Sequence, residues 1–335
     1  LHEIPPPAKH LHLPMISRIK IIAKLDIAEK RLPQDGSFSV RLKDRNIDLR
    51  VSVVPTIYGE KVVLRILDKM RVQLDIAKLG FDKKQLEEIR RAILSSYGLI
   101  FLTGPTGSGK TTTLYAILNE IKSPKLNIMT IEDPVELHLD VINQVQVKNE
   151  IGLTFSSALR SFLRQDPDVM MVGEVRDLDT AQMCVRASLT GHLVLSTLHT
   201  NDAPSAISRL IDIGIEPYLL MPSLILIVAQ RLLRVLCVHC KEPYEPTEDE
   251  KKGLDLGADL IYKPKGCEKC NHVGYSGRIC IAEVLVINDE IRRLIIEKSG
   301  ATKMMEVARS QGMFTLAESA LAKVREGTTS LEEAL

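Results

Sequence analysis

The sequence is poor in aromatic residues. It contains no Trp, and Phe, Trp and Tyr together make up 4% of its 335 residues. A protein that stacks single-stranded nucleic acid needs aromatic faces, so this composition argues against that class. The formal net charge is only +1, so the chain as a whole presents no strong field to a polyanion. We therefore expect no nucleic-acid partner.

Long apolar runs are also absent. The longest, Leu219–Ala229, has 11 residues and includes Pro222 and Ser223, whereas a helix that spans a bilayer needs about 20. We interpret this run as a buried helix and expect no transmembrane span. Hydrophobic residues still make up 45% of the chain, which is enough to build the cores of two domains.

The charge is distributed unevenly along the chain. Residues 1–71 carry 14 Lys and Arg against 8 Asp and Glu, a net charge of +6, and the remainder carries −5. A basic front segment suits nucleic acid, an anionic membrane surface, or the phosphates bound by another subunit. The hydrophobic pattern of this segment predicts one helix and three antiparallel strands, over 16–28, 38–42, 47–51 and 62–67.

These patterns predict a division of the chain. We expect a small α+β domain over 1–70, a linker over 71–80 and a larger domain over 81–335. The larger domain begins with a predicted helix over 82–95. Strands and helices then alternate, which is typical of an α/β parallel sheet. The strands are predicted over 99–103, 127–131, 168–172 and 192–198, and the helices over 111–122, 155–165, 178–189 and 202–213.

One stretch of the larger domain carries a nucleotide-binding signature. Gly104–Thr111 reads GPTGSGKT and fits the phosphate loop G-x-x-x-x-G-K-[ST], between a predicted strand and a predicted helix. Its glycines allow backbone N–H groups to surround phosphate oxygens. We expect Lys110 to reach the β- and γ-phosphates and Thr111 to hold Mg²⁺. The predicted nucleotide-binding residues are Gly104, Pro105, Thr106, Gly107, Ser108, Gly109, Lys110, Thr111 and Thr112.

Polar residues follow three of the other predicted strands. Glu132, Glu174 and His199 stand at or just after the ends of the strands over 127–131, 168–172 and 192–198. Ligands bind at the carboxyl ends of strands in open α/β sheets. Hydrolysis of a γ-phosphate needs a metal ion, an acid that orients water and positive charge. A single carboxylate is more often a solvated helix cap, but three such ends favour a site. Which acid contacts Mg²⁺ stays open.

The cysteines form two Cys-x-x-Cys pairs with 26 residues between them. The four residues are Cys237, Cys240, Cys267 and Cys270. Paired knuckles are typical of a closed, tetrahedral, structural Zn²⁺ site, and a redox role is the alternative. We expect a polar, loop-rich zinc-binding subdomain over 236–281 and C-terminal helices within 282–335. The other two, Cys184 and Cys280, have apolar neighbours and are expected in the core.

The ordered motifs resemble those of the secretion-type traffic ATPases, the motors of type II secretion and type IV pili. The resemblance covers essentially the whole chain and implies a RecA-like P-loop core with a small N-terminal α+β, PAS-like domain and a tetracysteine zinc-binding subdomain. The segments that match the Walker A, Asp, Walker B and His boxes and the second N-terminal domain are 104–111, 131–136, 173–177, 190–200, 24–31 and 48–52.

The resemblance also implies roles. ATP would bind at the subunit junctions of a homo-hexamer that acts on an inner-membrane platform protein at the cytoplasmic face. By matching position, Glu132 would activate water, Glu174 would be the Walker B acid near Mg²⁺, and His199 would sense the γ-phosphate. Arg50 and Arg65 of the small domain would reach the phosphates.

The tetracysteine element resembles that of export and assembly motors, whereas retraction motors lack it. We therefore expect a hexameric ATPase that uses ATP, Mg²⁺ and Zn²⁺ and drives pilus assembly or type II secretion. Its platform-docking segment is expected before residue 1. The alternatives are a nucleic-acid-dependent RecA-like ATPase and a nucleotide-gated scaffold. The composition argues against the first, and the set of Lys110, Glu132 and Glu174 argues against the second.

Overall fold

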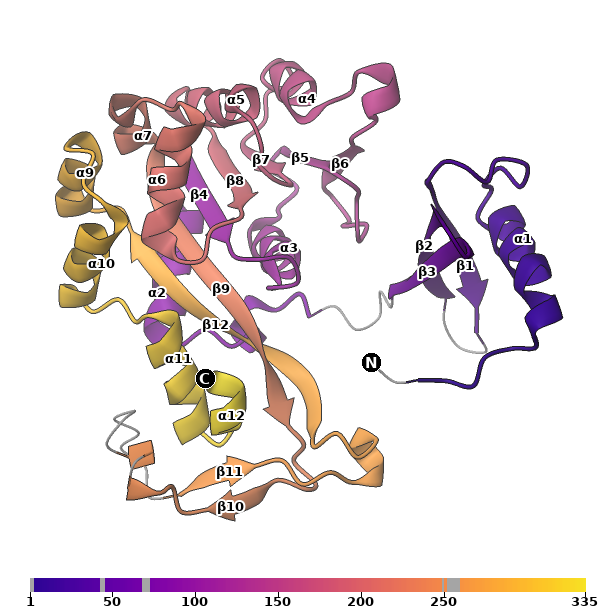
Figure 1. The fold of residues 1–335 in the computed structure, drawn as a ribbon. Helices are drawn as coiled ribbons and strands as arrows, with labels where there is room; N and C mark the ends of the chain where they lie inside the picture. The colour runs from indigo at the N-terminus through magenta and orange to yellow at the C-terminus, as the bar shows by residue number, and fades with distance from the viewer. Residues whose placement is uncertain (1–2, 43–45, 68–72, 249, 252–259) are drawn as a thin grey trace. The chain divides into compact units, whose positions relative to one another are not determined.

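The computed structural model describes residues 3–42, 46–67, 73–248, 250–251 and 260–335. The chain divides into two compact units, Leu1–Val72 and Gln73–Leu335. Figure 1 shows the elements of each unit. The expected linker covered 71–80, and from Gln73 onward this stretch belongs to the second unit, where Ile76 is fully buried.

The first unit packs a helix against a three-stranded antiparallel sheet. Its elements are α1 (His12–Ile22), β1 (Gln34–Arg41), β2 (Asn46–Thr56) and β3 (Gly59–Leu67), with the strands in the order β1-β2-β3. Val51 and Val53 of β2 lie in the core with Ala23. The predicted helix over 16–28 was wrong at both ends. It ends before Lys24 because that residue takes φ +58°, a left-handed conformation that does not continue a helix.

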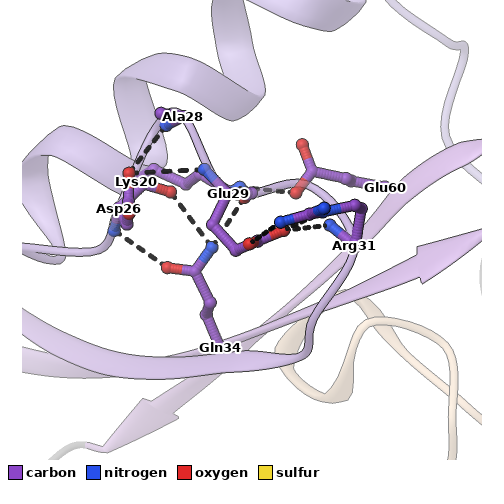
Figure 2. Close-up of polar contacts among 7 residues, drawn as sticks. All are labelled: Lys20, Asp26, Ala28, Glu29, Arg31, Gln34 and Glu60. Carbon is purple, nitrogen blue, oxygen red and sulfur yellow. Dashed lines mark hydrogen bonds and ion pairs between the residues drawn. The ribbon is translucent and has the colours of Figure 1, made fainter.

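A buried ion pair joins α1 to β3 in this unit (Figure 2). The Lys20 ammonium lies 2.5 Å from Glu60 Oε1 and donates to the Glu29 carbonyl oxygen at 2.7 Å. Gln34 donates to the same carbonyl oxygen at 2.9 Å. The Glu29 side chain in turn accepts from Arg31, so the segment between α1 and β1 is held by polar contacts as well as by the core.

The second unit contains a seven-stranded sheet in the order β12-β9-β4-β8-β7-β5-β6. Neighbouring strands are parallel except β12 and β9, which are antiparallel. The phosphate-loop strand therefore lies inside the sheet, between two parallel neighbours. The strands are β4 (Gly98–Thr103), β5 (Ile128–Glu132), β6 (Asn143–Gln146), β7 (Val169–Val172), β8 (Leu193–Leu198), β9 (Leu224–Leu236) and β12 (Tyr275–Val286).

Helices cover both faces of this sheet. One core contains residues of α2 (Lys83–Ile93) and α3 (Lys110–Ile121). The other contains residues of α4 (Phe155–Phe162), α5 (Leu178–Leu189), α6 (Ala203–Ile213), α7 (Pro217–Ser223), α9 (Asp289–Ile296) and α10 (Ala301–Ser310). Successive β4 residues point to opposite cores, so the strand is buried on both sides, as the α/β prediction requires.

The interpretation of Leu219–Ala229 as a buried helix was wrong. α7 ends at Ser223, and Leu224 begins the 13-residue strand β9. Leu224 and Ile227 lie in one core and Leu226 in the other. A strand that is buried on both faces has an uninterrupted apolar sequence, so periodicity alone does not distinguish it from a buried helix. Within the described residues, no helix is long and apolar enough to cross a bilayer.

The stretch over 236–281 is less loop-rich than expected. β10 (Glu242–Tyr244) and β11 (Ile261–Lys263) form an antiparallel pair. β12 then begins at Tyr275 and runs back into the main sheet, so 282–286 is strand rather than the start of the C-terminal helices. Figure 1 shows β9 and β12 as a long ribbon that connects the sheet with β10 and β11. The helices α11 (Leu316–Arg325) and α12 (Leu331–Ala334) end the chain.

Candidate ATP-hydrolysis site

The carboxyl ends of the central parallel strands meet at a cavity of about 380 Å³ in the second unit. The phosphate loop forms one wall, and the residues after β5, β7 and β8 form others. The lining residues are Thr106, Gly107, Ser108, Gly109, Lys110, Thr111, Thr112, Leu114, Glu132, Asp133, Pro134, Glu136, Phe155, Met171, Gly173, Glu174, Thr197, His199, Leu232 and Arg278.

The backbone of the phosphate loop requires glycine. Gly104 has φ +143°, and a Cβ there would lie 2.5 Å from the Gln230 carbonyl oxygen. Gly109 has φ +90° and precedes α3 as its N-cap. β9 thus forms the floor of the loop, and the Gln230 side chain donates to the Ser108 carbonyl oxygen at 2.8 Å. The turn delivers the N-terminus of α3 to the cavity, where backbone N–H groups favour an anion.

Lys110 is the first residue of α3, and its ammonium is buried in the loop. It donates to the carbonyl oxygens of Gly104 and Pro105 at 2.6 and 3.1 Å. Burial lowers the pKa of Lys110, and the Glu174 carboxylate opposes this shift. Both bonded acceptors are neutral, so a phosphate anion competes well for the ammonium. The exposed Thr111 follows at the start of the helix.

Glu132 ends β5 and is 3% exposed. Its Oε1 accepts from Thr130 Oγ1 at 2.6 Å and from Gln144 Nε2 at 3.1 Å. Its Oε2 accepts from the Tyr115 hydroxyl. Three donors from β5, β6 and α3 thus fix this carboxylate at the wall of the cavity.

Glu174 lies in a more open, charged setting. Arg176 Nη2 is 2.5 Å from its Oε1, and His199 Nε2 is 3.5 Å from its Oε2. The bond to Glu174 raises the pKa of Arg176. The helix-cap alternative does not hold for Glu174, because Asp177 caps α5 by accepting from the Thr180 N–H at 2.8 Å. The residues predicted for the nucleotide and catalytic site of the larger domain therefore line one cavity, apart from Gly104 and Pro105, which are not among its lining residues.

Arg50 and Arg65 belong to the first unit. They are opposite each other on β2 and β3, and Ser37 of β1 pairs with Arg50 on the other side. The alternation of a strand places Arg50 on the sheet face opposite the buried Val51. Their side chains thus start from neighbouring positions on one face.

Sequence reasoning missed several residues of the site. Leu232 lies on β9 and Arg278 on β12, and both line the cavity. The helix predicted over Leu219–Ala229 stopped short of Leu232, to which no element was assigned, and Arg278 was placed in the loop-rich stretch. Tyr115 and Gln144 contact Glu132 from α3 and β6. No local motif marks either residue, since each meets Glu132 only through tertiary structure.

The four expected zinc ligands come together. The Sγ atoms of Cys237, Cys240, Cys267 and Cys270 all lie within 4.8 Å of one another, with three of the distances at 3.8 to 4.0 Å. Zn–S bonds of about 2.3 Å in a tetrahedron place sulfurs about 3.8 Å apart, so the cluster fits Zn²⁺. His239 and His272 are exposed and are not part of the cluster.

The backbone around the cluster favours a thiolate. Burial alone would raise the pKa of Cys270, but the N–H groups of Cys267 and Gly274 each lie 3.2 Å from its Sγ and lower that pKa to about 6. A cysteine binds a metal ion as the thiolate, so this shift favours ligation by Cys270. Cys184 and Cys280 are buried in the core as expected, and burial raises the pKa of each thiol to about 12.

The parallel sheet, the phosphate loop and the acidic strand ends define the chain as a RecA-like P-loop ATPase with a tetracysteine element whose geometry suits zinc. The family described as type II/IV secretion system protein matches residues 1–335. The chain belongs to this family.

Named relatives agree with this assignment. The chain is 49% identical to the type II secretion system ATPase E of Vibrio cholerae, covering all of this chain and 67% of the relative. It is 50% identical to the type IV pilus assembly ATPase PilB of Myxococcus xanthus, covering 99% of this chain and 60% of the relative. The chain thus spans about three fifths to two thirds of the length of these relatives.

Solved structures support the fold. The pilus retraction motor PilT with bound ADP is 31% identical, with a TM-score of 0.66 over 91% of this chain and 77% of that chain. The DotB ATPase of Yersinia pseudotuberculosis is 21% identical with a TM-score of 0.69, over 96% of this chain and 81% of that chain, and shows the fold alone. The family and the site together make this chain an ATP hydrolase.

Proposed function

We propose that this chain is the motor of a type IV pilus assembly or type II secretion machine. It would act as a cytoplasmic homo-hexamer that hydrolyses ATP to drive pilus or pseudopilus subunits through an inner-membrane platform protein. The observation that carries the proposal is the single cavity shared by the phosphate loop, Glu132, Glu174 and His199. The similarity to a secretion ATPase and to a pilus assembly ATPase supports both variants, at 49% and 50% identity.

The phosphate loop and the polar side chains at the strand ends each have a proposed role. The loop amides and Lys110 bind the β- and γ-phosphates. Thr111 and Glu174 would hold Mg²⁺, which neutralises charge on the phosphates when bound. Glu132 orients and deprotonates the attacking water. His199 would contact the γ-phosphate. Its Nε2 lies 3.5 Å from Glu174 Oε2, so a movement of His199 when that phosphate leaves would change its contact with Glu174.

The first unit completes the site in this proposal. Arg50 and Arg65 would contact phosphates bound at the junction of two subunits. The support is chemical: residues 1–71 carry a net charge of +6, and the two arginines are opposite each other on β2 and β3. Arginines that stabilise transferring phosphoryl groups contribute roughly 10³–10⁵-fold in rate.

Turnover tests the catalytic assignment. We expect Lys110→Ala to abolish phosphate release and Glu174→Gln to retain ATP binding while slowing hydrolysis by at least ~100-fold. Lys122→Ala, which removes an exposed lysine just beyond α3, is the matched control and should behave as wild type. Steady-state phosphate release near the wild-type rate in either site variant would refute the assignment.

Mixing tests the arginine assignment. Lys110→Ala protein and Arg65→Ala protein should each be inactive alone. If a site joins the phosphate loop of one subunit to Arg65 of its neighbour, random mixed hexamers restore about a quarter of the sites, since each junction needs two intact contributors. Complete absence of activity after subunit exchange would exclude completion by a neighbour. Wild-type rates for Arg65→Ala alone would exclude any role for that residue.

A further inference from the structure

The Glu132 carboxylate has one open position for a hydrogen bond among the described residues. A carboxylate offers about four lone-pair sites. Oε1 uses both of its sites to accept from Thr130 and Gln144, and Oε2 uses one to accept from Tyr115. The remaining site is on Oε2. A water that Glu132 activates would therefore share this oxygen with the Tyr115 hydroxyl.

The direction of the Tyr115 hydroxyl is itself fixed. The phenol oxygen accepts from the backbone N–H groups of Glu136 and Leu137 at 3.1 and 3.4 Å. A phenol has one donor hydrogen, so with its oxygen facing two amides that hydrogen points to Glu132. Tyr115 is 1% exposed, and burial, followed by the bond to Glu132, raises the pKa of its hydroxyl, so the group remains a donor.

This arrangement joins three parts of the site. Tyr115 lies on α3, the helix that begins with Lys110, so its ring position follows the phosphate-loop helix. The amides that orient its hydroxyl belong to the segment after β5, and its acceptor is the last residue of β5. A shift of either segment would change the direction of Oε2.

We propose that Tyr115 is a positioning residue for ATP hydrolysis, which orients Oε2 of Glu132 toward the attacking water. The proposal rests on the proposed function, in which Glu132 activates that water. Thr130 provides the matched comparison, because its hydroxyl also donates to Glu132 but does so to the other oxygen. A purely structural role would make the two hydroxyls equivalent.

The experiment compares Tyr115→Phe with Thr130→Val in the full-length protein. Each variant removes one hydroxyl and keeps the shape of the side chain. We expect Tyr115→Phe to lower kcat for ATP by about 10–100-fold with KM changed less than about threefold, because a misdirected base affects the transition state and not ground-state binding. Thr130→Val should lower kcat by less than about threefold. Equal effects of the two variants, or a Tyr115→Phe kcat near wild type, would overturn the proposal.

Two further measurements remove the remaining ambiguities. Equilibrium binding of a fluorescent ATP analogue identifies a variant that has failed to fold, since such a variant loses binding as well as turnover. If Tyr115→Phe fails in this way, Tyr115→4-fluorophenylalanine replaces it as the test, because the fluorine fills the space of the hydroxyl and donates no hydrogen bond to Oε2. This variant should lower kcat for ATP with KM little changed, and an unchanged kcat would overturn the proposal. Glu132→Gln distinguishes the levels of the argument. Normal hydrolysis in Glu132→Gln refutes the proposed role of Glu132, whereas an inactive Glu132→Gln beside a fully active Tyr115→Phe refutes only the role of Tyr115.

Discussion

Removing one partner of the Lys20–Glu60 ion pair should strongly destabilise the first unit and leave the stability of the ATPase unit unchanged. The Lys20 side chain is 1% exposed and the Glu60 side chain 10% exposed, so both charges are largely withdrawn from water. Glu60→Ala leaves the neutral Glu29 carbonyl oxygen as the remaining acceptor of the ammonium among the described residues. Breaking a buried pair in this way costs about 3–5 kcal/mol.

This loss is large for so small a domain. Three buried residues, Ala23, Val51 and Val53, form the centre of its core. At about 0.05–0.15 kcal/mol per residue, a unit of this length has a total stability of roughly 4–11 kcal/mol. One substitution would therefore remove a large fraction of that stability.

Hydrogen exchange measured peptide by peptide in the full chain separates the two units. We expect Glu60→Ala to lower amide protection in β2 and β3 by at least ~100-fold, because each 1.4 kcal/mol is a factor of ten, and to leave β4 and α3 unchanged. The double variant Lys20→Met/Glu60→Leu removes both charges and should recover most of the protection. Protection within about threefold of wild type in Glu60→Ala, or no recovery in the double variant, would refute the reasoning.

Three further outcomes follow from single sites. Gly104→Ala should abolish binding of a fluorescent ATP analogue, because the new Cβ would lie 2.5 Å from the Gln230 carbonyl oxygen. In Gly107→Ala the new Cβ has no atom within 4 Å, so only the backbone strain of about 1–2 kcal/mol should weaken binding. Equal loss of binding in the two variants would contradict this. Metal analysis of protein purified without chelator should find one Zn²⁺ per chain, and Cys267→Ser should lose the metal and lower the melting temperature; metal-free wild type would exclude the site. Hydrogen bonds from Arg31 lower the pKa of Glu29 from 4.5 to about 2, so their contribution to the first unit is present above pH 4.5 and lost as pH falls toward 2. Glu29→Gln should flatten the pH dependence of unfolding in this window, and an unchanged pH profile would argue against the pair.

Local sequence patterns predicted many of the helices and strands of the second unit. The phosphate loop, the strands before and after it and the helices over 178–189 and 202–213 were all predicted from the sequence, because glycine spacing, caps and strand length are properties of neighbouring residues. The second of these helices is capped by Asp202, whose side chain accepts from the Ser205 N–H at 2.8 Å. The spacing of the cysteines likewise predicted a four-thiolate cluster, and the structure brings the four sulfurs together.

The errors had a different origin. The apolar run that ends in β9 carries no period, since both faces of that strand are buried, and its assignment depends on β4 and β12 beside it. Arg278 lines the nucleotide cavity because β12 pairs with β9, a contact between residues more than 40 positions apart. The residues that neighbour β9 and Arg278 in the sequence do not predict these strand pairings.

The sequence by itself determined the available chemistry: which residues can bind phosphate, which acids stand at strand ends and which thiols can hold zinc. These depend on residue type and short spacing. Only the tertiary structure decided how the groups are held, for example that Tyr115 occupies one oxygen of Glu132 and that Arg50 lies opposite Arg65. Such contacts join elements that are distant in the chain, and their geometry is fixed by the packing of the sheet and its helices rather than by any local preference.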